Sequence, residues 1–142
     1  MRARYAPNRG INLDYIMWLF TRISGISIVL LALVGLGSAM YMGARLQMDL
    51  PTVLRWTFLP IPNHVINSNI PNIVPGWANS FWVVMQFLII FFAFTHAANG
   101  LRMIIEDYLT NPRWQNVLRV ILVIVWIVMV YGAFKVVIAA AY

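Results

Sequence analysis

The chain of 142 residues contains no cysteine, and only four of its residues are acidic. Without cysteine it can form no disulfide, ligate no iron–sulfur cluster through thiolates and use no thiol nucleophile. Charged residues make up 10% of the sequence, whereas a typical soluble domain has about 25%. These shortages exclude thiol chemistry and the charged surface of a conventional soluble protein.

Apolar residues dominate instead. Hydrophobic residues make up 62% of the chain, and the mean hydropathy is +0.79. The length accommodates about three membrane helices of roughly 20 to 25 residues with a connecting loop. We therefore expect an all-α integral membrane protein that forms a single membrane-anchor domain over residues 1–142. The formal charge of +6 does not indicate a nucleic-acid partner, because the basic residues flank the apolar spans.

Apolar runs and prolines set the expected boundaries. We expect a cytoplasmic arm at 1–14, three transmembrane helices at 15–43, 80–107 and 113–140, and a long outer loop at 44–79. Proline excludes a continuous helix through that loop, which contains Pro51, Pro60, Pro62, Pro71 and Pro75. Its tryptophans suggest that the loop lies along the membrane interface. His64 lies in this loop, and we expect it to be solvated.

The placement of arginine and lysine predicts the orientation. Seven basic residues lie in the arm, at the start of the first span or around the short turn at 108–112: Arg2, Arg4, Arg9, Arg22, Arg102, Arg113 and Arg119. Three lie in the long loop or near the far end of the third span: Arg45, Arg55 and Lys135. Because basic residues concentrate on the cytoplasmic side, we expect a multi-pass protein of the inner (plasma) membrane. Its N-terminus would be cytoplasmic, and the proline-rich loop and C-terminus outside.

His96 is the only histidine within the apolar spans. If Asp107 lies at the inner interface, His96 is about 16 Å deeper, near mid-bilayer. An ionisable residue at that depth is costly, so a functional role is expected. On a helix His96, Gly100, Met103 and Asp107 share one face. That face offers a nitrogen ligand, a gap without a side chain, and a carboxylate.

Haem ligation would use these features together. It needs a neutral imidazole, which His96 offers, and clearance beside it, which Gly100 offers. Arg22 and Arg102 are placed to pair with the haem propionates. Two alternatives remain open: His96 as a polar residue hydrogen-bonded to a neighbouring helix, and Arg22 as an arginine that snorkels to the interface.

The run Glu106-Asp107-Tyr108 stands at the inner end of the second span. Tyr108 can donate a hydrogen bond to a quinone carbonyl while the acids handle protons. Alternatively, the acids cap the turn and the tyrosine belongs to the interfacial aromatic belt. Spacing alone leaves both interpretations open.

Two motifs resemble those of a known family. Arg22-Ile23-Ser24-Gly25 resembles the R-x-S-G motif of succinate dehydrogenase membrane anchors. The run from His96 to Arg102, followed by Asp107-Tyr108, resembles the H-x-x-x-G…D-Y pattern of the family's second helix. The D-Y ending is similar to that of the smaller, D-type anchor. The order of the motifs and the three-span plan extend the likeness over most of the chain, although the long proline-rich loop departs from it.

The resemblance implies roles for individual residues. His96 would be an axial ligand of the haem b iron, with Arg22 beside the propionates and Gly100 and Arg102 in the haem environment. Tyr108 would contact the quinone headgroup, with Asp107 beside it and Ser24 in the same quinone site.

The resemblance also implies a function. The chain would be the membrane anchor of a succinate dehydrogenase, carrying no catalytic residue of its own for dicarboxylate chemistry. It would attach a flavoprotein subunit and an iron–sulfur subunit, which hold FAD and the clusters, to the lipid membrane for electron transfer from succinate to quinone. A C-type anchor subunit would share haem b and supply its second ligand. The alternatives are a fumarate reductase anchor and a non-catalytic membrane assembly or scaffold protein, in which His96 only packs helices.

Overall fold

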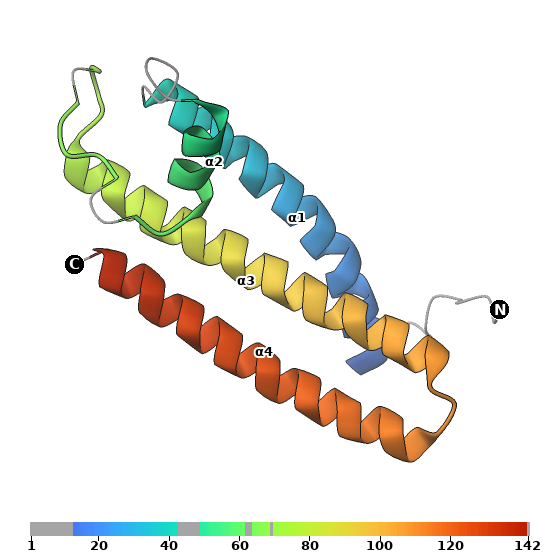
Figure 1. The fold of residues 1–142 in the computed structure, drawn as a ribbon. Coiled ribbons are helices and arrows are strands. Elements are labelled where there is room, and N and C mark those ends of the chain that lie inside the picture. The colour runs from blue at the N-terminus through green and yellow to red at the C-terminus, as the bar shows by residue number, and fades with distance from the viewer. Residues whose placement is uncertain (1–12, 43–48, 62–63, 69, 142) are drawn as a thin grey trace.

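The structure is a computed structural model that describes residues 13–42, 49–61, 64–68 and 70–141. Nearly all of the predicted arm at 1–14 lies outside these residues. Within these ranges four helices follow one another: α1 (Leu13–Tyr41), α2 (Leu50–Phe58), α3 (Pro75–Tyr108) and α4 (Pro112–Ala141). Helix α3 packs between α1 and α4, and α2 packs against α1 (Figure 1). Strands are absent from the described ranges.

Three of these helices, α1, α3 and α4, are long and apolar enough to cross a membrane. The predicted fold class, an all-α membrane protein with three spans, is thus confirmed. Large apolar side chains are exposed along all three helices, and α4 in particular has Val120, Ile124 and Val128 more than half exposed. In the membrane, apolar surfaces that are exposed in the chain on its own face lipid or another membrane protein.

Proline begins two of the spans. Pro75 occupies the first turn of α3, ahead of the expected start at residue 80, and Pro112 is the first residue of α4. A proline fits there because the first helical N–H groups have no intrahelical acceptor. The 34 residues of α3 extend about 51 Å at 1.5 Å per residue, which exceeds a hydrocarbon core of about 30 Å. Part of α3 therefore extends beyond the core.

The predicted loop at 44–79 contains a helix that the sequence analysis did not anticipate. Asp49 caps α2, because its side chain accepts a hydrogen bond from the Thr52 backbone N–H at 3.3 Å, and Pro51 lies in the first turn. Gly35 lets α2 approach α1 closely: a Cβ there would lie 3.2 Å from Cγ2 of the buried Thr57. The proline-rich connection is thus partly folded back against the bundle.

The most buried apolar cluster of the described residues lies at the end of the bundle that carries α2, which we call the loop end. It brings together Ala39 of α1, Val53 of α2, and Trp82 and Met85 of α3. Trp82 is fully buried, and its indole N–H donates to the Met42 sulfur at 3.2 Å. We call the opposite end, where residues 109–111 join α3 to α4, the turn end. The start of α1 also lies at the turn end (Figure 1).

His64 belongs to the loop-end packing, so the expectation of a solvated histidine is wrong. Its ring is half-buried, stacks on Trp82 at a centroid distance of 5.3 Å and meets the edge of Trp56 at 5.0 Å. Its Nε2 lies 2.8 Å from the Trp56 carbonyl oxygen and 2.9 Å from Nε2 of Gln86. Packing against the two tryptophan rings stabilises the imidazole in this position, because aromatic rings interact favourably when stacked or edge to face. This burial lowers the pKa of His64, and its backbone hydrogen bonds only partly oppose the effect.

We predict that this histidine makes stability fall in acid. Because the folded pKa lies below the ordinary value of about 6.5, the unfolded chain binds the proton more tightly. The stability that the neutral, buried His64 contributes is therefore fully present above about pH 6.5, and it is lost as the pH falls below that value. Thermal melting of the purified membrane complex between pH 7.5 and 5.5 should show this loss, and His64→Gln should flatten the dependence. Equal slopes in the two proteins would contradict the assignment.

Candidate functional site

His96 lies half-buried on α3 and contacts α1 through one edge of its ring. Its Nδ1 is 2.9 Å from Oγ of Ser24, which is fully buried. Gly25 follows on α1, where a Cβ would lie 3.5 Å from Cε1 of His96, an ordinary van der Waals contact. Nε2 of His96 makes no hydrogen bond with any side chain or backbone group of the described ranges. The ring is thus oriented through Nδ1 and can bind a ligand through Nε2.

Asn99 lies one turn further along α3 and joins the same helix pair. Its Nδ2 donates to the Met17 carbonyl oxygen at 3.3 Å and also contacts Oγ1 of Thr21, which itself donates to that carbonyl. Asn99 is 3% exposed, and its Oδ1 is buried without a partner among the described residues. Sequence analysis gave Asn99 no role, although a second polar residue three positions after His96 in an apolar run was a usable signal.

A third polar contact connects α3 to α4. The Trp126 indole N–H donates to Oγ1 of Thr95 at 2.9 Å, while the Thr95 hydroxyl donates to the Phe91 carbonyl oxygen at 2.7 Å. Thr95 therefore uses both its acceptor and its donor inside the protein. Helix α3 thus presents His96 and Asn99 to α1 and Thr95 to α4, within five residues of one another.

At the turn end one carboxylate serves two guanidiniums. Oε1 of Glu106 lies 2.8 Å from Nε of Arg119 and 3.6 Å from Nε of Arg102. Gln115 donates from its amide to the Leu109 carbonyl oxygen, which ties the start of α4 to the end of α3. Glu106, one of the two acids expected to handle quinone protons, is thus paired with two arginines.

The structure separates several residues that the sequence analysis grouped. Arg22 is exposed, and its guanidinium carbon lies 4.3 Å above the Trp18 ring. Arg102 pairs with Glu106 and does not reach His96. Tyr108 is 84% exposed, and at 1.5 Å per residue it lies about 18 Å along α3 from His96. Because Ser24 contacts His96, the structure does not bring Ser24 and Tyr108 together.

Gly100 and Asp107 lie on the His96 face of α3, as the helical spacing predicts. Apart from the backbone of its own helix, a Cβ on Gly100 would meet no atom of the described residues within 4 Å, so there is open space beside it. Asp107 is exposed and makes a further interaction. Space is therefore open at Gly100, one turn along α3 from His96.

Metal-ligating side chains are scattered through the described ranges. No group of three or more histidine, aspartate or glutamate side chains converges there in a way that could hold an ion. An axial imidazole ligand of a haem needs no such group, since the porphyrin supplies four nitrogens and the protein supplies the axial positions. Nε2 of His96 has no partner among the described residues, and Gly100, one turn away, borders open space.

Residues 4–132 match the family model of the succinate dehydrogenase/fumarate reductase transmembrane subunit. The chain belongs to this family. It is thus a membrane subunit of such a complex, and catalytic partner subunits are implied. Its three span-length helices make it a multi-pass membrane protein. Individual curated proteins give no significant match to the chain.

Proposed function

We propose that the chain is the smaller, D-type membrane anchor of a succinate dehydrogenase, where it supplies one imidazole ligand to haem b and one part of the quinone site. The observation that carries the proposal is the orientation of His96, which is held at Nδ1 by Ser24 and has Nε2 available. A fumarate reductase anchor has the same parts and is the alternative within the family.

Ser24 supports haem ligation as a positioning residue. A histidine ligand of a metal usually donates its second ring N–H to a neighbouring acceptor, which sets the tautomer and the ring angle. The Ser24 hydroxyl oxygen lies 2.9 Å from Nδ1 and can accept a hydrogen bond from the Nδ1–H group. This tautomer leaves the lone pair of Nε2 available to iron. We therefore assign Ser24 to the haem ligand and not to the quinone. The bound haem would supply one-electron redox chemistry in the membrane.

The second haem ligand would come from another chain. His64, the only other histidine, packs at the loop end against Trp82 and Gln86. Gln86 precedes His96 by ten residues, or about 15 Å along α3. Moving His64 to the haem would expose backbone polar groups to lipid, at several kcal/mol for each unpaired group. A C-type anchor subunit that packs on the open Gly100 side supplies the second imidazole.

The propionate and quinone assignments rest on two exposed side chains, Arg22 and Tyr108. Arg22 is exposed two residues before Ser24, so a partner-bound haem can reach its guanidinium. Tyr108 presents its hydroxyl at the turn end, with Asp107 beside it in the sequence. There the iron–sulfur and flavoprotein subunits would dock from the cytoplasm, so that electrons from succinate reach the quinone through their clusters.

Haem binding is tested by two substitutions that act differently. His96→Ala removes the ligand and should abolish the low-spin b-type absorption spectrum of the purified complex. Gly100→Leu keeps the ligand but fills the open space, and it too should lose most of that spectrum. Gly132→Leu on α4 is the matched control, since a Cβ there also meets nothing within 4 Å. An unchanged spectrum in His96→Ala would sink the haem assignment and favour a scaffold role.

The quinone assignment predicts a selective defect. Tyr108→Phe removes one hydrogen-bond donor and keeps the ring, so quinone reduction should fall by up to about tenfold, the effect of one lost hydrogen bond. Succinate oxidation with a soluble artificial acceptor should stay near normal. Tyr131→Phe, an exposed tyrosine on α4, is the control. Equal loss in both assays would indicate misassembly and not a quinone contact.

The orientation is tested by labelling. Because the chain lacks cysteine, Asn67→Cys and Thr110→Cys each introduce a unique, exposed thiol. With the arginine-rich turn end in the cytoplasm, Asn67→Cys should react with a membrane-impermeant maleimide in intact cells, and Thr110→Cys only after permeabilisation. The reverse pattern would invert the topology and place Tyr108 on the side away from the catalytic subunits.

A further inference from the structure

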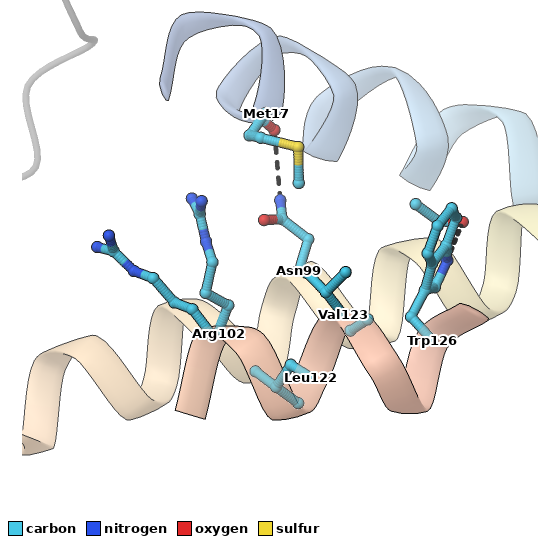
Figure 2. A pocket seen from close by; sticks show the side chains of 9 residues that line it. Met17, Asn99, Arg102, Leu122, Val123 and Trp126 are labelled. Atoms are coloured by element: carbon cyan, nitrogen blue, oxygen red, sulfur yellow. Dashed lines mark hydrogen bonds between the residues drawn. The ribbon is translucent and has the colours of Figure 1, made fainter. Parts of the chain in front are cut away.

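A cavity of about 360 Å³ lies among α1, α3 and α4 near the turn end. We call it the turn-end cavity. Its walls from α4 are Leu122, Val123 and Trp126, and Met17 of α1 covers it from the other side (Figure 2). Arg102 lies at one end of the cavity and Trp126 at the other. The cavity therefore has a charged end and an apolar end.

The turn-end cavity is separate from the haem and quinone assignments. It is lined from α3 by Thr95, Asn99 and Arg102, which share one helix face at about 100° per residue. His96 and Gly100 lie on a face turned by about 100° from it. The exposed Tyr108 is not part of the lining.

The charged end carries a net positive charge. Arg102 and Arg119 line the cavity, and the single carboxylate of Glu106 pairs with both. Both guanidiniums contact Glu106 through Nε, and their terminal nitrogens make no hydrogen bond to another group in the part of the chain that the structure describes. Nε of Arg102 is buried without a hydrogen bond. Two planar guanidiniums with free donors suit a phosphate group.

Asn99 adds a requirement for a donor. Its Nδ2 is engaged by the Met17 carbonyl oxygen and the Thr21 hydroxyl, so the amide cannot turn over without placing oxygen against oxygen. The buried Oδ1 of this 3% exposed residue therefore remains an acceptor in need of a donor. A hydroxyl on the same ligand that carries the phosphate can supply it.

The depth of the cavity suits a lipid. Arg119 lies seven residues into α4, and Trp126 lies seven residues further, so the apolar walls continue about 10 Å deeper than the guanidiniums. An anion with an apolar tail fits this order from interface to membrane core, and basic pockets between membrane helices bind anionic lipid headgroups. A quinone headgroup is neutral and would leave the positive charge uncompensated.

We propose that the turn-end cavity binds one anionic phospholipid whose headgroup carries a hydroxyl. The phosphate pairs with Arg102 and Arg119, the hydroxyl reaches towards Asn99, and an acyl chain lies along Leu122, Val123 and Trp126. The lipid fills the space among the three spans beside the docking end of the complex.

Native mass spectrometry of the delipidated, intact complex tests the proposal with phosphatidylglycerol as the probe. One molecule should bind about tenfold more tightly than phosphatidylcholine, a difference that one well-placed charge pair can supply. Arg119→Gln should weaken phosphatidylglycerol binding by about fivefold, the effect of one basic side chain near an anionic headgroup. Arg113→Gln removes the same charge at the same turn but outside the lining, and should leave the affinity unchanged.

Several outcomes overturn the proposal. These are equal binding of the two lipids, unchanged affinity in Arg119→Gln, or an equal loss in Arg113→Gln. Displacement by inorganic phosphate alone would make the site a free-anion site, and displacement by a short-chain quinone would make it a quinone site. If Arg119→Gln does not assemble, Val123→Trp decides by the same criterion, since it fills the cavity and retains both arginines. The haem spectrum is measured in parallel and does not enter this comparison.

Discussion

Every polar side chain on the buried faces of α3 needs a partner from a neighbouring helix, because the membrane core offers no water to hydrogen-bond it. The described structure meets this constraint three times within two turns. His96 is paired with Ser24, Asn99 with Met17 and Thr21, and Thr95 with Trp126. These pairs connect α3 to α1 on one side and to α4 on the other. The position of the proposed haem ligand depends on them.

Hydrophobic burial does little to hold such spans together, since lipid tails are as apolar as the side chains they touch. Close packing at small residues and polar pairs between helices do this work instead. Gly25 lets α1 contact the His96 ring, and Gly35 lets α2 contact α1. At the loop end, the Trp82 cluster and the stacked His64 add a compact core. At the turn end, the Glu106 ion pairs join α3 to α4.

The exposed surfaces explain why this chain works as a subunit. Gly100 opens onto space that no other described part of the chain fills, and Tyr108 is almost fully exposed. The proposed haem and quinone sites are each complete only when another subunit covers these faces. The turn-end cavity, in contrast, is enclosed on three sides by this chain's own helices, which suits a bound lipid that stays with the subunit.

The sequence by itself determined the three spans, the helical face shared by His96, Gly100 and Asp107, and the family. The spans and the shared face follow from local rules, namely apolar run length and helical spacing, and the family follows from the match over residues 4–132. It also held a local signal for α2 that went unused, since Asp49 followed by Pro51 is a typical helix start. Ser24 as the partner of His96, the aromatic packing of His64 and the ion pair between Arg119 of α4 and Glu106 of α3 were decided by tertiary structure. Each depends on the rotation and distance of one helix relative to another, and an apolar sequence leaves those free because many rotations bury similar surface.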